Sequence, residues 1–255
     1  MITRRKFGLG IASILSTGIA PAAIVKSIVA GREQSFCGGA KLPYDAEVEY
    51  LESTRTQWID TGVAGNEIRA DGAIEGEVMF TAKTGGWAPA AAIGSDHNLN
   101  FYGLDNSNIR IYSRFNDFFM AFYASAFGID TFVGIKVKTT ARGGYWKVEI
   151  NGTELQYNTR YTYLCADNTD RLLLFWSKGG TFRAPARIYW FKVFKGNNLI
   201  RDFIPVRFTN EFGQSEGAMY DRANPTAGMN RDGMPRMDGL YLNRGTGGFV
   251  IGPDK

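Results

Sequence analysis

The chain has 255 residues, of which 44% are hydrophobic and 14% aromatic, so it holds enough apolar material for one large core. Its 31 glycines and 8 prolines favour many short strands with tight turns over disorder. Residues 1–30 contain four of the 29 Lys and Arg residues and no acid, which leaves 25 basic against 25 acidic residues in the remainder. A body without net charge has no basic stripe for phosphates, which argues against nucleic-acid binding.

Residues 1–30 follow the order of an export signal: a basic start, an uncharged run and then small residues. The paired Arg4 and Arg5 in TRRKF resemble the twin-arginine signal, whose receptor reads the two arginines directly. This resemblance implies export to the periplasm or the exterior, with membrane contact only through the leader. An N-terminal amphipathic helix is the alternative, and similar leaders occur on structural proteins of tailed bacteriophages.

Residues 31–43 are polar and glycine-rich, which predicts a linker. The two cysteines, Cys37 and Cys165, are too few for a disulfide framework or a metal knuckle. We expect two free thiols or one incidental bridge.

The body, residues 44–255, is read as one domain of short strands separated by turn-forming residues. The predicted strands include 46–51, 58–61, 74–80, 90–95, 99–104, 109–113, 131–140, 145–150, 153–155 and 171–176. Asn151-Gly152 predicts a type I′ turn between two of them. Segment 115–127 is ambiguous and predicts a short helix or an irregular aromatic loop. This spacing predicts an all-β fold of two packed antiparallel sheets.

Residues 186–206 predict a hairpin that turns at 196–198. A period of two places Tyr189, Phe191 and Val193 on one face of its first arm, with Ile188 and Trp190 on the other. So apolar a hairpin must be covered by a second sheet, which makes it a core element of the fold.

Several strings in the body resemble one family. They are VEYLEST (48–54), TQWIDTG (56–62), RIY (187–189), LIRDFIPV (199–206), MYD (219–221), GTGGF (245–249) and GP (252–253). They are similar to laminin-G-like, concanavalin A-like jelly rolls of gut-bacterial surface proteins and phage tail or fibre proteins, over residues 44–255. The resemblance implies a two-sheet jelly-roll sandwich. The glycine-rich loop at 224–239 departs from the family, which has a brief hairpin there.

Sugar binding is the use that we expect for this surface, because aromatic rings with amide and charged groups suit a polyol. The candidate ligand-binding residues are Trp87, Asp96, His97, Asn98, Tyr102, Tyr112, Arg114 and Trp146. The other aromatic residues are expected in the core.

Oxygen-bearing side chains are concentrated in the same region, and hard cations need such ligands. The candidate calcium ligands are Asp96, Asp105, Asn106 and Asp117, and laminin-G-like domains often hold calcium at a loop rim. Asp and Asn are also the residues that turns favour, so turn formation is the alternative. No other cofactor is predicted.

Catalysis has little support in the sequence. His97 is the single histidine, and its neighbours Ser95 and Asp96 cannot form a triad by adjacency. Glu47 with Glu49, and Glu75 with Glu77, have the spacing of paired glycosidase carboxylates, but any solvated sheet face shows the same pattern.

The sequence therefore predicts an exported, non-enzymatic binding module that recognises a glycan or a surface partner. The alternative is a bacteriophage virion component, such as a tail or fibre protein, in which the fold serves structure or adhesion and oligomerises. A glycoside hydrolase is the third hypothesis. N-terminal sequencing separates the first two, because a chain that starts near Gly31 supports export and an intact Met1 in virions supports the second.

Overall fold

The computed structural model describes residues 41–68, 72–82, 88–93, 99–105, 110–115, 118–123, 133–142, 145–150, 152–157, 169–176 and 185–255. The chain divides into two compact units, Met1–Lys41 and Leu42–Lys255, and the second unit is described below. The predicted leader with Arg4 and Arg5, most of the predicted linker and both cysteines lie outside the described residues.

The described residues of the domain form two β-sheets, of 13 and 6 strands. The large sheet has the order β11 (Thr153–Tyr157), β10 (Tyr145–Ile150), β9 (Lys136–Arg142), β4 (Ala73–Phe80), β13 (Pro185–Lys195), β14 (Asn198–Thr209), β15 (Ser215–Asp221), β18 (Leu240–Tyr241), β16 (Gly228–Met229) and β17 (Pro235–Arg236). In addition, β1 (Ala46–Glu47) pairs with β14, β2 (Leu51–Thr54) with β13, and β19 (Val250–Ile251) with β2. The small sheet has the order β3 (Ile59–Ala64), β12 (Arg171–Leu174), β5 (Ala88–Ile93), β6 (Leu99–Asp105), β7 (Arg110–Phe115) and β8 (Phe118–Tyr123).

The two sheets pack face to face around one large core. Strand β4 contributes Ile74, Val78 and Phe80 to it, while Glu75 and Glu77 point outward. Opposite them lie buried residues of the small sheet, from β3, β5 and β12. This alternation is that of an antiparallel sheet with one solvated face, and the predicted all-β sandwich is confirmed. One helical turn, α2 (Gly65–Ile68), follows β3.

The predicted hairpin is present as β13 and β14, and the predicted faces are wrong only at Ile188 and Tyr189 of its first arm. The pairing with β4 shifts between Ile188 and Trp190, which marks a β-bulge. One inserted residue moves the alternation by one position, so that Ile188 joins Phe191 in the core. Tyr189 lies instead on the outer side of the sheet, where Lys136 Nζ is 3.9 Å from its ring centroid.

The prediction of a helix or a loop over 115–127 is wrong for the described part of this segment. Residues Phe118–Tyr123 form strand β8, which pairs in register with β7 from Arg110↔Tyr123 to Phe115↔Phe118. Aromatic and apolar residues in succession fit a strand as well as a helix, and the neighbouring strand decides between them.

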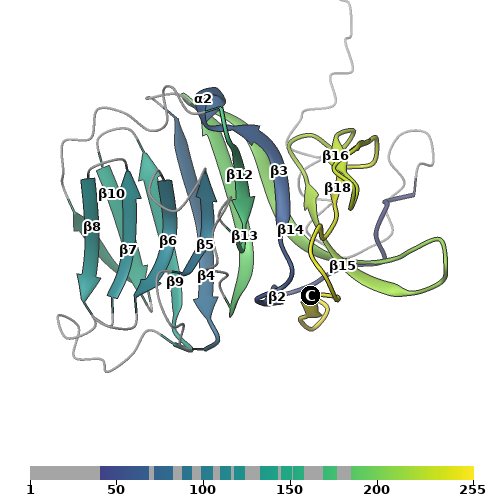
Figure 1. Cartoon of the computed structure of the whole chain (residues 1–255), viewed down its shortest axis with the longest axis horizontal. Helices are drawn as coiled ribbons and strands as arrows, with labels where there is room; N and C mark the ends of the chain where they lie inside the picture. Colours follow the sequence, from purple (N-terminus) through teal and green to yellow (C-terminus); the bar gives the residue numbers. More distant parts are fainter. Residues whose placement is uncertain are drawn as a thin grey trace, which may run out of the picture. The chain divides into compact units, whose positions relative to one another are not determined.

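The large sheet extends beyond β3 (Figure 1). There its strands β14 and β15 bury side chains on both faces. Phe203 and Met219 belong to the core between the sheets, whereas their neighbours Ile204 and Tyr220 belong to a second apolar cluster on the opposite face. Strand β18 adds Leu240 to that cluster. The C-terminal segment thus completes the part of the domain that the small sheet does not reach.

None of the helices in the described ranges is long and apolar enough to cross a bilayer.

Candidate functional site

Half of the predicted sugar-binding residues lie outside the described residues. Trp87, Asp96, His97 and Asn98 are in that half. Of the others, Tyr102 lies in β6, Tyr112 and Arg114 lie in β7, and Trp146 lies in β10 of the other sheet. For these four the structure gives the backbone position alone, so the site stays a prediction.

The predicted calcium site also stays a prediction. Asp105 is the last residue of β6, while Asp96, Asn106 and Asp117 lie outside the described residues. In the described ranges there is no group of three or more His, Cys, Asp or Glu side chains that would hold a metal ion.

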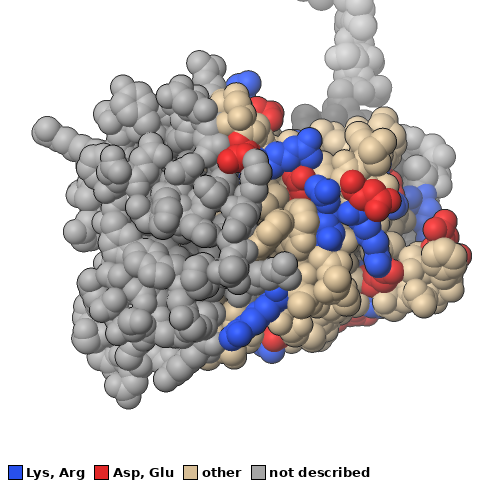
Figure 2. Space-filling model, in the orientation of Figure 1, with Lys and Arg blue, Asp and Glu red and all other residues tan. Residues whose placement is uncertain are grey.

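The acidic side chains considered for glycosidase chemistry lie on the outer face of the large sheet. Lys136 Nζ is 3.0 Å from Glu49 Oε1 and 3.8 Å from Glu77 Oε1, so one lysine pairs with both acids. Figure 2 shows acidic and basic side chains interspersed over the described surface of one face, as the balanced charge of the body predicts.

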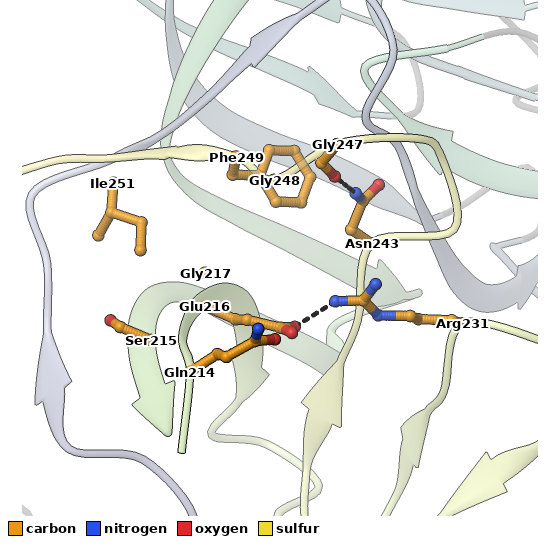
Figure 3. A pocket seen from close by; sticks show the side chains of 10 residues that line it. All are labelled: Gln214, Ser215, Glu216, Gly217, Arg231, Asn243, Gly247, Gly248, Phe249 and Ile251. Atoms are coloured by element: carbon orange, nitrogen blue, oxygen red, sulfur yellow. Dashed lines mark hydrogen bonds and ion pairs between the residues drawn. The ribbon is translucent and has the colours of Figure 1, made fainter. Parts of the chain in front are cut away.

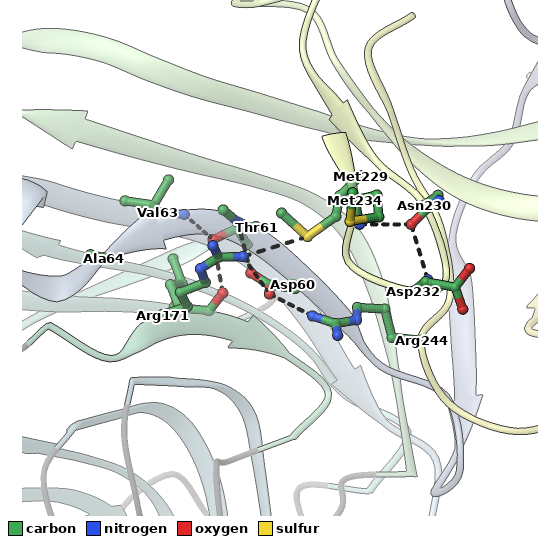
Figure 4. Close-up of polar contacts among 12 residues, drawn as sticks. Asp60, Thr61, Val63, Ala64, Arg171, Met229, Asn230, Asp232, Met234 and Arg244 are labelled. Atoms are coloured by element: carbon green, nitrogen blue, oxygen red, sulfur yellow. Dashed lines mark hydrogen bonds and ion pairs between the residues drawn. The ribbon is translucent and has the colours of Figure 1, made fainter. Parts of the chain in front are cut away.

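A buried charge cluster lies where the edge strand β3 meets the C-terminal segment. Asp60 is only 4% exposed, and its Oδ2 accepts hydrogen bonds from Arg171 Nη1 at 3.0 Å and Arg244 Nη1 at 2.8 Å (Figure 4). Its other oxygen accepts the N–H of Gly62 at 2.9 Å. We call Asp60, Arg171 and Arg244 the Asp60 cluster. It joins strand β12 and the C-terminal segment to β3.

Arg201 of β14, in the large sheet, bonds to the outer edge of β3, which is the end strand of the small sheet. Its Nε donates to the carbonyl of Thr61 at 3.3 Å and lies 3.6 Å from Asp221 Oδ2. The positive charge of Arg201 also offsets part of the rise that burial causes in the pKa of the Tyr241 hydroxyl. An edge strand carries unpaired backbone groups, and a side chain that bonds one of them blocks further strand addition at that point.

Asp221 is fully buried beside Arg201. Its Oδ1 accepts the N–H groups of Asp202 at 2.9 Å and Ala223 at 3.0 Å. Burial nevertheless raises the pKa of this carboxyl above its ordinary value, because the lowering by Arg201 and by the N–H donors is smaller. Asp221 therefore takes up a proton more readily in the folded than in the unfolded chain.

This raised pKa predicts a pH dependence of stability. Between the ordinary pKa of 3.8 and the raised pKa of the folded state, the Asp221 carboxyl is protonated in the folded chain but ionised in the unfolded chain. The contribution of Asp221 to the free energy of unfolding therefore falls as the pH rises through this window. In Asp221→Asn, which keeps an oxygen for the two N–H donors, this component is expected to vanish. Urea unfolding of both proteins over a pH series measures it. The wild-type minus variant free energy of unfolding should fall with rising pH, and a constant or rising difference would contradict the assignment.

A hollow of about 230 Å³ lies next to this region, between the β14–β15 hairpin and the C-terminal segment. Polar side chains and glycine backbone form most of its wall, and two apolar side chains complete it (Figure 3). The lining residues are Gln214, Ser215, Glu216, Gly217, Arg231, Asn243, Gly247, Gly248, Phe249 and Ile251.

Two turns of the same construction support the hollow. Both have the pattern Asn-x-x-Gly-x, at 210–214 and 230–234. In the first, Asn210 Oδ1 accepts the N–H groups of Phe212 and Gln214. In the second, Asn230 Oδ1 accepts those of residues 232 and 234 in the same way. Gly213 and Gly233 have φ angles of 76° and 82°, which is why glycine stands there.

An ion pair joins the two turns across the hollow. Glu216 accepts from Asn210 Nδ2 at 2.6 Å and from Arg231 Nη2 at 2.5 Å, so both of its oxygens are held. Asn243 fixes the opposite wall, because its amide donates to the carbonyl of Gly247 at 2.6 Å. A Cβ on Gly248 would meet nothing within 4 Å, so the wall is open at that point.

The sequence interpretation missed the hollow and the role of the Asp60 cluster. Asp60 lies in a string that indicates only the fold, and its partners are 111 and 184 residues away. A usable signal for the hollow was present: the Asn-x-x-Gly-x pattern occurs twice, twenty residues apart. Such a repeat predicts two equivalent turns, but it does not predict that the two turns lie side by side.

No known protein-family profile matches the chain, and no curated protein matches it. Among solved structures, it aligns with full-length tailspike protein 2 from the Escherichia coli O157:H7 bacteriophage CAB120, at 14% identity and a TM-score of 0.39, over 67% of this chain and 31% of that one. It also aligns with the enzymatically active domain of tailspike protein 2 of bacteriophage CBA120, at 17% identity and a TM-score of 0.35, over 64% and 24%. The chain therefore spans less than a third of either tailspike chain.

Proposed function

We propose that this domain is a non-enzymatic binding module and that the hollow beside the β14–β15 hairpin takes one sugar residue. The observation that carries the proposal is the composition of the wall. Gln214, Ser215, Glu216 and Arg231 supply donors and acceptors, while Phe249 and Ile251 supply an apolar surface. A sugar ring needs both, because its hydroxyl groups form hydrogen bonds and its C–H faces pack on apolar groups.

The size and rigidity of the hollow support the same ligand class. Its volume, about 230 Å³, is below the range of about 300–1,000 Å³ for drug-sized ligands, so it suits one small polar ring. The two Asn-x-x-Gly-x turns hold the polar side chains in place through backbone bonds. Preorganised groups lose less conformational entropy when a ligand binds.

A binding module of this kind serves both settings predicted from the sequence, an exported surface protein and a virion adhesion protein. The hollow acts in the same way in each, because it lies wholly within residues 214–251 of the domain.

A glycan array tests the proposal directly. We expect the full chain to bind a subset of the glycans, and Gly248→Leu to weaken that binding at least about tenfold, because Gly248 lines the hollow and leucine adds bulk at its wall. The matched control is Thr246→Leu, an exposed residue of the same loop that does not line the hollow. Equal binding by both variants, or no binding by the wild type, would contradict the proposal.

A further inference from the structure

A contiguous row of four side chains extends from the Asp60 cluster to a pair of indole rings. The rings of Trp58 and Trp176 lie 4.6 Å apart between centroids, at 52°. Arg244 lies with its guanidinium carbon 4.9 Å from the Trp58 centroid and also reaches Asp60, which Arg171 shares. We call Trp176, Trp58, Arg244 and Arg171 the aromatic–arginine row.

The row lies on the side of β3 that faces away from the main core. Ile59 and Val63 of β3 are core residues, whereas Trp58 and Asp60 occupy the alternate positions. Both indole side chains are partly exposed. Half of the Arg171 side chain is exposed as well. The row thus offers solvent both an aromatic and a cationic part.

The charges of the Asp60 cluster do not balance. Asp60 is the one acid that pairs with Arg171 and Arg244 in the described contacts, so these three side chains together have one positive charge in excess. Each guanidinium contacts Asp60 through Nη1, and a guanidinium has five N–H donors. The Nε of Arg244 is buried and has no hydrogen-bond partner among the described residues. The cluster therefore has donor capacity beyond what Asp60 uses.

We infer that the aromatic–arginine row is a second binding site, for a saccharide that carries a carboxylate. The C–H face of the sugar packs on the indole rings, and its carboxylate accepts hydrogen bonds from Arg171. A purely structural ion pair would account for the burial of Asp60 but requires neither the excess charge nor two partly exposed indoles beside it. The inference goes beyond the proposed hollow, because none of the four residues lines that hollow.

The test compares an acid with its own neutral ester. The full chain is titrated with polygalacturonate and alginate oligomers and with their methyl esters, in which each carboxylate is replaced by a neutral ester. We expect the acids to bind at least about tenfold more tightly than the esters, which corresponds to one charge-assisted hydrogen bond. Arg171→Gln should lose that preference, and Arg171→Lys should retain part of it, because lysine keeps the charge without the planar fork.

Two further variants distinguish binding at the row from general charge attraction and from binding in the hollow. Arg207→Gln removes the same charge at an arginine that pairs with Asp254 elsewhere, and it should leave the preference unchanged. Gly248→Leu should also leave it unchanged, so that failure of the hollow and failure of the row are distinguishable. Equal binding of acids and esters, no binding of either, or equal losses in Arg171→Gln and Arg207→Gln would overturn the inference. Circular dichroism checks that each variant is folded.

Discussion

Asp60→Ala is expected to lower the free energy of unfolding by about 3 kcal/mol, because it leaves two arginines without their shared acid. The cost arises mainly from Arg244, whose side chain is 24% exposed, since Arg171 is half exposed and can turn to water. The N–H of Gly62 loses its acceptor at the same time. Urea unfolding followed by tryptophan fluorescence measures the change.

The control for Asp60 is an acid in an exposed ion pair. Asp254 contacts Arg207 at 2.8 Å, and both side chains are accessible to water. Asp254→Ala should therefore change the unfolding midpoint little. If the two variants lose the same stability, the Asp60 cluster does not hold β3 to its neighbours in the way described.

Gly245→Ala is expected to destabilise the domain by about 3 kcal/mol through a steric clash. A Cβ at this position would lie 1.7 Å from the carbonyl oxygen of Thr56 and 2.9 Å from the Cα of Gln57. The two segments are fixed there by backbone bonds, from the N–H of Arg244 to Trp58 and from that of Thr246 to Thr56. Because the obstacle is backbone, a rotamer change cannot remove it.

Gly248→Ala, three residues along the same loop, is the matched control. Its Cβ would meet nothing within 4 Å, and its φ is not in the positive region. We expect little change in the thermal unfolding midpoint of this variant and a large fall for Gly245→Ala. Similar midpoints for the two variants would show that the chain relaxes at the crossing, against the prediction.

The strand pattern was predictable where local residues decide it. The alternation at 74–80 specifies β4, and Asn151-Gly152 specifies the hairpin of β10 and β11, in which Gly152 has a φ of 76°. The prediction failed at Ile188 and Tyr189, because a period of two assumes that no residue is inserted, and a bulge inserts one. It failed at 118–123 because a short apolar run fits a strand as well as a helix.

The described site was less predictable than the fold, because its members are far apart along the chain. Gln214 and Arg231 line one hollow only because two separate turns meet through Glu216. Asp60 and Arg244 join elements that are 184 residues apart in the sequence. Residue types alone instead predicted a site in the Asp- and Asn-rich segments around Asp96. Pairings of this kind follow from tertiary structure, which local patterns do not contain.

The pairing of β2 with β19 has a consequence for how the chain folds during synthesis. Leu51 lies opposite Ile251, and Val48 forms a bridge with Asp254, so contacts that close the large sheet join residues about 200 positions apart. Contacts of such long sequence separation form slowly, because a large loop must close first. Residues 250–254 must therefore leave the ribosome before β2, which pairs with β13 along one edge, gains a partner along the other. Until then the edge of β2 that β19 covers is open to pairing with other strands.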